Sequence, residues 1–134
     1  MYMVMENYFN KWIGQIRRGY LELCIFALII RLEKTYGFEI ISTAETLGLS
    51  IKEGTLYPIL NRMTKEGHLS ANWDIQNVQG HPRKFYSITP QGRELFGRMK
   101  AEFEDMNETF HKACTIEKIL TQPSKEEEQT EKPS

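Results

Sequence analysis

One change of period in the apolar pattern, at Gly67, constrains what this chain can fold into. Before Gly67, apolar residues recur every three to four positions, as on the buried face of α-helices. After it, apolar and polar residues alternate over 69–75, as in a half-buried β-strand. Turn-forming residues at 77–82 and a second strand at 83–88 follow. We therefore expect a mainly α fold with a small β-hairpin after its helices.

The spacing of apolar residues predicts four helices before the hairpin, at 1–18, 20–34, 36–47 and 51–66. The second is apolar nearly all round, which is typical of a buried helix. The first is an amphipathic N-terminal helix, and its apolar face consists of Met5, Phe9, Trp12, Ile13 and Ile16.

Three local signals mark the boundaries of these helices. Gly48 supplies the left-handed residue that often ends a helix, and Ser50 and Glu53 have the spacing of a capping box at the start of the fourth. Pro58 lacks a backbone donor and leaves two arrangements open. Either Pro58 kinks the fourth helix, or Thr55 is a second N-cap and Pro58 lies in a first turn whose donors are free anyway.

The last helix, expected at 91–121, has the most regular pattern in the chain. Thr89 and Pro90 supply its N-cap and a first-turn proline. Steps of three and four, the period of a helix–helix seam, separate Phe96, Met99, Phe103, Met106, Phe110 and Ala113. Since an isolated helix would expose this stripe to water, we expect a homodimer interface; the alternative is a monomer in which the stripe folds back on its own winged helix. Residues 122–134 are expected to be a disordered acidic tail.

The charge of the chain is unevenly distributed, although its formal total is only -1. Residues 11–100 hold 13 Lys and Arg against 8 Asp and Glu, a formal charge of +5. Residues 101–134 hold 4 Lys against 9 Asp and Glu, a formal charge of −5. A basic body followed by an acidic segment is expected when only part of a chain faces phosphate.

A helix, a short turn, a second helix and a hairpin, in that order, are typical of a winged helix-turn-helix, whose second helix enters the major groove. We expect 19–90 to form this DNA-binding domain, with 51–66 as the recognition helix and Trp73 in the core beneath it. The predicted phosphate contacts on that helix are Lys52, Arg62 and Lys65. Bases or phosphates are the predicted partners of Thr55, Tyr57 and Asn61. Beside the hairpin turn, a basic cluster for the DNA backbone consists of His81, Arg83 and Lys84.

Five segments, in the same order and spacing, resemble the PadR family of bacterial transcriptional regulators. They are RGYLEL (18–23), YGFEII (36–41), EGTLYPILNRM (53–63), KEGHL (65–69) and PRKFYSITPQG (82–92). The resemblance covers residues 17–98, and its third and fifth segments are together highly specific.

This resemblance implies a winged-helix homodimer that binds double-stranded DNA at a palindromic operator, usually as a repressor. It also implies that the C-terminal helix pairs with its partner. Some relatives are released by phenolic acids, and others by hydrophobic drugs that stack on a tryptophan of the C-terminal helix. This chain departs from that pattern, because its last helix carries no tryptophan. The candidate pocket for a small aromatic or hydrophobic effector consists of Trp12, Phe103 and Met106; otherwise Trp12 belongs to the core.

Two other classes of function are compatible with parts of this sequence. A winged helix can dock protein without binding specific DNA, because a fold does not determine function. A metal sensor has little support, since the only ligand-like pair, His111 and Cys114, cannot by itself complete a tetrahedral site. No nucleophile with a neighbouring base and no glycine-rich phosphate loop is visible, so we expect neither an enzyme nor a cofactor.

The sequence also predicts where the protein acts. Its longest apolar run, at 23–30, is too short to span a bilayer, and we expect no membrane partner. The N-terminal residues lack the pattern of a secretory signal. Two cysteines, Cys24 and Cys114, do not make a disulfide framework and suit a reducing compartment. We therefore expect a cytoplasmic protein.

Overall fold

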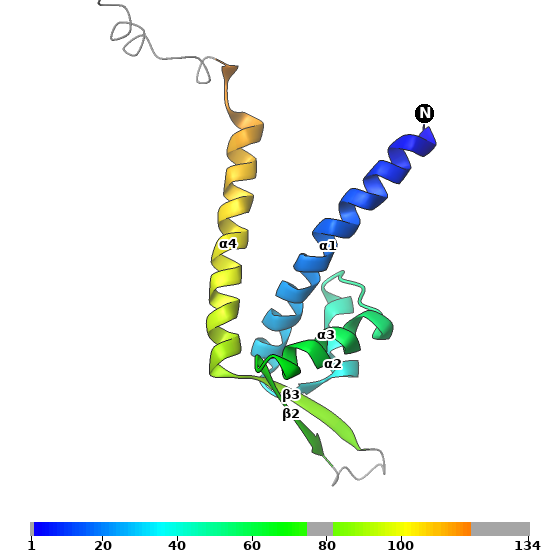
Figure 1. Cartoon of the computed structure of the whole chain (residues 1–134), viewed down its shortest axis with the longest axis vertical. Coiled ribbons are helices and arrows are strands. Elements are labelled where there is room, and N and C mark those ends of the chain that lie inside the picture. The colour runs from blue at the N-terminus through cyan, green and yellow to red at the C-terminus, as the bar shows by residue number, and fades with distance from the viewer. Residues whose placement is uncertain (1, 75–81, 119–134) are drawn as a thin grey trace, which may run out of the picture. The chain divides into compact units, whose positions relative to one another are not determined.

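The computed structural model describes residues 2–74 and 82–118, and it confirms a mainly helical fold with a small antiparallel sheet (Figure 1). These residues form two compact units, which divide the last helix after Lys100. The elements, in chain order, are α1 (Tyr2–Leu32), β1 (Thr35–Tyr36), α2 (Gly37–Thr46), α3 (Glu53–Lys65), β2 (Leu69–Asp74), β3 (Arg83–Ile88) and α4 (Pro90–Thr115).

Helix α1 is one continuous element of 31 residues, so the predicted division into two helices is wrong. Gly19 does not interrupt it, because a single glycine inside a helix costs only about 1 kcal/mol and both neighbouring segments are strongly helical. The helix ends before Glu33, which adopts a left-handed φ of 67°. Within α1, the large apolar residues up to Ile16 are exposed except for Ile13, which is half-buried, whereas the half from Leu21 onward is packed into the core.

The core lies between the second half of α1, the helices α2 and α3, and the sheet. Its fully buried side chains include Ile25, Ile29, Ile40, Leu56 and Leu60. Burying one such side chain contributes about 1.5–3 kcal/mol, so this cluster is the main support for the position of α3. Leu95, Phe96 and Met99 are partly buried against the same cluster.

Between α2 and α3, the end of α2 is as predicted, but the start of α3 is not. Gly48 has a positive φ of 82°, and its amide donates to the Glu45 carbonyl, as expected for a helix end. The capping box is wrong: Lys52 occupies the N-cap position, without a side-chain cap. Ile51 is buried in the core, and the helix begins only at Glu53, so Ser50 lies too far before the first turn to cap it.

Pro58 lies inside α3, past the first turn. Since Thr55 is already helical, the arrangement with Thr55 as a second N-cap is wrong. The missing amide of Pro58 leaves the Gly54 carbonyl without its helical donor, yet the helix continues to Lys65.

The three strands form an antiparallel sheet in the order β1–β3–β2. The predicted hairpin is confirmed, with a register that runs from Leu69 opposite Ile88 to Asp74 opposite Arg83. Strand β1 was not predicted, because two residues are too few to show a period. The predicted turn at 77–82 lies, except for Pro82, outside the described residues.

The predicted start of α4 is confirmed by its hydrogen bonds. The Thr89 hydroxyl accepts from the Gly92 amide at 3.0 Å and donates to the Gly67 carbonyl at 2.7 Å. Gly92 has no room for a side chain, since a Cβ there would lie 2.1 Å from the His68 carbonyl oxygen. These contacts fasten the start of α4 to the end of the turn before β2. Over residues 2–74 and 82–118, no helix combines the length and hydropathy that a bilayer crossing requires.

Candidate nucleic-acid interface

Helix α3 presents every predicted contact residue of its segment to solvent. The core side is held by Leu56, Ile59, Leu60 and Met63, all of which are buried. The exposed positions are those predicted from the sequence: Lys52, Thr55, Tyr57, Asn61, Arg62 and Lys65. The helix therefore has one face in the core and leaves the rest of its surface available to a partner.

The outermost stripe of α3 carries little side-chain bulk near its N-terminus. At 100° per residue, Gly54, Pro58, Asn61 and Lys65 follow one another along the face opposite the core. A Cβ at Gly54 would have nothing within 4 Å. This flat start of the helix lets a ligand approach the backbone closely.

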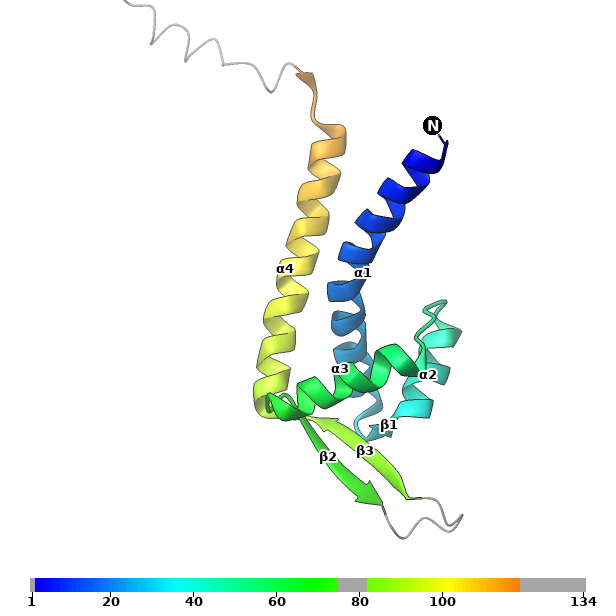
Figure 2. The same ribbon diagram turned by 45° about the vertical axis from the view of Figure 1, so that its right-hand side comes forward.

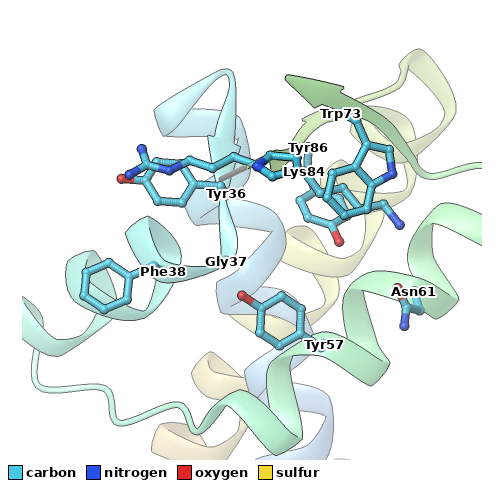
Figure 3. A pocket seen from close by; sticks show the side chains of 10 residues that line it. Tyr36, Gly37, Phe38, Tyr57, Asn61, Trp73, Lys84 and Tyr86 are labelled. Carbon is cyan, nitrogen blue, oxygen red and sulfur yellow. The ribbon is translucent and has the colours of Figure 1, made fainter. Parts of the chain in front are cut away.

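A groove of about 460 Å³ lies between α3, the junction of β1 with α2, and the hairpin (Figure 3). Helix α3 contributes Tyr57 and Asn61, and the β1–α2 junction contributes Tyr36, Gly37 and Phe38. The hairpin contributes Trp73, Pro82, Arg83, Lys84 and Tyr86. Residues predicted separately on the recognition helix and on the wing thus line one groove. His81, the third predicted wing residue, lies outside the described residues.

Aromatic rings position the cations of strand β3. The guanidinium carbon of Arg83 lies 4.5 Å from the centre of the Tyr36 ring. The Lys84 ammonium lies 5.7 Å from the Trp73 ring and 5.9 Å from the Tyr86 ring. Because ring faces attract cations, these contacts limit the rotamers of both side chains before any ligand binds.

Tyr57 occupies space that only a glycine at position 37 leaves open. A Cβ at Gly37 would lie 2.2 Å from the Tyr57 hydroxyl oxygen, and Figure 3 shows that hydroxyl pointing toward Gly37. Tyr86, which is 2% exposed, lies near it; burial raises the pKa of the Tyr86 phenol, and the neighbouring Tyr57 raises it further. The groove side of α3 is therefore sterically well defined.

Arg62 has a different environment, on the flank of α3 that meets α1. Its guanidinium donates a 2.5 Å hydrogen bond to the Glu22 carboxylate, and it lies 3.7 Å from the Glu66 carboxylate. Arg62 does not line the groove that Tyr57 and Asn61 share. The structure thus separates Arg62 from the other predicted contacts on α3.

Sequence reasoning missed the aromatic residues of the groove other than Tyr57, namely Tyr36, Phe38, Trp73 and Tyr86. The prediction of Trp73 in the core is wrong, because its side chain is 60% exposed. Burial along β2 falls from Leu69 to Trp73, since the hairpin extends beyond the helices that cover its base (Figure 2). Phe38 is also exposed and was not predicted. The sequence signal for an exposed Trp73 was its position opposite Lys84 in the predicted hairpin.

The predicted dimer stripe on α4 has two environments. Phe96 and Met99 are partly buried against the core of the first unit. In the second unit Phe103, Met106 and Phe110 are exposed, with Met106 at 56% and Phe110 at 59%. Met106 and Phe110 are therefore the most exposed of the large apolar side chains in the stripe.

The N-terminal half of α1 also exposes an apolar surface. Trp12 is 50% exposed and its ring lies 5.9 Å from that of Phe9, so the prediction of a core position is wrong for this chain. A shallow apolar hollow of about 880 Å³ is lined by Tyr2, Val4, Met5, Tyr8, Phe9 and Trp12. Trp12 belongs to the first unit, and Phe103 and Met106 belong to the second; an effector pocket that combines them remains a prediction.

The residues considered for metal binding are dispersed. His68 packs edge-on against Phe26, and the His111 ring lies beside Phe110. Cys24 and Cys114 are free thiols. Within the described ranges, no three His, Cys, Asp or Glu side chains converge on a point that could hold a metal ion.

Comparison with known proteins identifies the family. Residues 25–98, more than half of the chain, match the model of the transcriptional regulator PadR-like family. The chain belongs to this family. PadR-like proteins are transcriptional regulators rather than enzymes. The match therefore confirms the predicted PadR family and the prediction that the protein is not an enzyme, and it makes this chain a DNA-binding regulator by class.

Three PadR-like relatives illustrate the match. A PadR-like transcription factor from Bacteroides fragilis is 37% identical; the alignment covers 75% of this chain and 96% of that one, with a TM-score of 0.66. A PadR-like regulator from Bacillus cereus is 31% identical, with coverage of 77% and 99% and a TM-score of 0.67. A Lysinibacillus sphaericus protein, described only as uncharacterized, is 33% identical over 71% of this chain and 88% of its own length.

Proposed function

We propose that this PadR-like protein is a cytoplasmic repressor that binds a palindromic operator as a homodimer. The observation that carries this proposal is the groove in which Tyr57 and Asn61 of α3 face Arg83 and Lys84 of the hairpin. A groove between a recognition helix and a basic wing suits a DNA backbone strand that passes from the major groove to the wing.

Each side chain of this surface has a proposed role. Asn61, on the outer stripe of α3, offers the amide geometry that pairs with an adenine edge. Lys52, Lys65, Arg83 and Lys84 neutralise phosphates, and His81 is a further proposed contact. Tyr57 and Thr55 donate hydroxyl hydrogen bonds to phosphates or bases. Gly54 and Pro58, with no long side chains, allow α3 to lie close to the floor of the DNA major groove.

The proposed homodimer follows from the exposed apolar surfaces. Phe103, Met106 and Phe110 of α4 form one surface, which continues the partly buried Phe96 and Met99. The hollow around Phe9 and Trp12 on α1 forms another. Burial of one such aromatic side chain contributes about 1.5–3 kcal/mol, so pairing these surfaces between two copies is favourable. A two-fold dimer presents two recognition helices to half-sites of a palindrome.

The same surfaces suit a small aromatic or hydrophobic effector, for which we propose Trp12, Phe103 and Met106 as contacts. Such a ligand would favour a dimer with a different separation of the recognition helices. It can weaken DNA binding only by its difference in affinity for the two dimer states.

Fluorescence anisotropy tests the DNA-binding part of the proposal. The labelled duplex is taken from upstream of the protein's own gene, and a scrambled duplex of equal length is the control. We expect tighter binding to the first duplex, with an affinity that falls steeply as salt rises, because phosphate contacts release counterions. Absence of binding to either duplex at low salt would favour a protein-docking module instead.

Replacement of Phe103 by Glu tests the dimer. A charge in the α4 surface is expected to dissociate the protein at low micromolar concentration, since an unpaired buried carboxylate is strongly unfavourable. Sedimentation velocity measures the mass, with Lys100→Glu, on an exposed position of the same helix, as the control. A Phe103→Glu protein that keeps the wild-type mass would exclude α4 as the interface.

A further inference from the structure

We infer that Arg62 is a positioning residue, which with Glu22 ties the recognition helix to α1, and that it does not bind phosphate. This inference rests on the proposed DNA-binding function of α3. It changes the role expected from the sequence, in which Arg62 was one of three equivalent cations on that helix.

The contacts of Arg62 engage its guanidinium within the protein. It donates to Glu22 at 2.5 Å, across 40 residues of sequence, and Glu66 lies 3.7 Å away on the next turn of α3. One cation thus faces two carboxylates. Hydrogen bonds between charged groups are short and directional, so this arrangement orients the guanidinium toward α1.

The position of Arg62 on α3 also directs it away from the groove. Consecutive helical residues point about 100° apart, so Arg62 cannot share the direction of Asn61. Asn61 lines the groove, whereas Arg62 meets the flank where α3 lies beside α1 (Figure 2).

Release of Arg62 to a phosphate would be unfavourable for a second reason. The Glu22 side chain is 29% exposed and that of Glu66 is 55% exposed. Without Arg62, both carboxylates would remain near the DNA backbone as uncompensated negative charges. Arg62 is therefore poorly suited to bind a phosphate.

As a link between helices, the pair has a specific consequence. Helix α1 carries Glu22 and, further toward its N-terminus, the apolar surface around Phe9 and Trp12. In the proposed dimer, the direction of each recognition helix depends on how α3 is held against α1. Because the pair is partly exposed, it adds little to global stability, and its effect is on orientation.

Salt dependence separates a positioning role from a phosphate contact. Affinity for a mixed-sequence duplex is measured against salt concentration for the full chain and for Arg62→Gln, Glu22→Gln and Lys65→Ala. Lys65 lies on the outer stripe of the same helix and is the matched control for a true phosphate contact. We expect Lys65→Ala to lower the magnitude of the slope by about 1, whereas Arg62→Gln and Glu22→Gln leave the slope unchanged.

Both substitutions at the pair should weaken binding, and the double variant should be no weaker than Arg62→Gln alone. A slope reduced by about 1 in Arg62→Gln, or tighter binding in Glu22→Gln, would overturn the inference, because either result means that Arg62 reaches phosphate.

Hydrogen exchange without DNA tests the link even if the wild-type protein binds no duplex, an outcome that would contradict only the proposed function. Arg62→Gln and Glu22→Gln are expected to speed amide exchange both around residue 62 on α3 and around residue 22 on α1. Unchanged exchange in both segments would overturn the inference.

Discussion

The polar residues on the two flanks of α3 have opposite environments. On the groove flank, Tyr57 and Asn61 face a hairpin whose cations, Arg83 and Lys84, lie against aromatic rings. On the other flank, Arg62 is held by two carboxylates. A ring orients a cation without neutralising it, whereas a carboxylate does both. The difference indicates that the positive potential available to DNA lies on the groove flank.

Replacement of Gly37 by Ala should have the largest effect, because it deforms the groove flank directly. The added methyl would lie 2.2 Å from the Tyr57 hydroxyl oxygen, so that side chain must move. Because Tyr57 is 39% exposed, its ring can turn toward solvent, so we expect a loss of no more than about 1 kcal/mol in the free energy of unfolding and a larger loss of DNA affinity. Urea denaturation and anisotropy measure the two effects.

Gly97→Ala is the control for that substitution. Gly97 is also helical, but a Cβ there would have nothing within 4 Å. It should stabilise the protein by up to about 1 kcal/mol, because alanine is the better helix former. Equal DNA affinity of the Gly37→Ala and wild-type proteins would show that the position of Tyr57 does not contribute to binding.

Replacement of Lys84 by Ala tests whether the cations on rings face DNA. Loss of one phosphate contact should weaken binding by about 1 kcal/mol, roughly fivefold, and lower the magnitude of the salt slope by about 1. Anisotropy at several salt concentrations measures both quantities. An unchanged slope would place Lys84 outside the interface and remove the main contrast between the flanks.

Trp73→Ala should act through Lys84 with a smaller effect. Since Trp73 is 60% exposed, its loss should change the free energy of unfolding by less than about 1 kcal/mol. DNA affinity should still fall, because Lys84 loses the ring that orients it. Trp73→Phe, which keeps a ring, should retain most of the affinity. Equal affinities for the two variants would argue against orientation by the ring.

The smallest expected effect on stability is that of Arg62→Gln. Partly exposed ion pairs contribute about 0.2–1 kcal/mol, so the free energy of unfolding should fall by no more than this. Chemical denaturation of Arg62→Gln and Glu22→Gln should give similar small losses. A loss of several kcal/mol would mean that the α1 flank is part of the structural core.

Most elements of the fold follow from local sequence. Apolar spacing predicted the region of each helix, the hairpin and the exposed positions of α3, because these features depend on neighbouring residues. Gly48 and Thr89 were placed correctly for the same reason: a helix end is determined by a few adjacent dihedral angles and hydrogen bonds. Ser50 was misplaced because the burial of Ile51, a tertiary contact, outweighed a local capping signal.

By itself, the sequence determined the order of elements, the chemistry of the recognition helix and the family. Tertiary structure alone decided which of those residues act together. It placed Gly37 beneath Tyr57, brought Arg83 to the face of the Tyr36 ring, and joined Arg62 to Glu22. The physical reason is that a period or a cap depends on residues a few positions apart, whereas each of these contacts joins elements that only folding brings together.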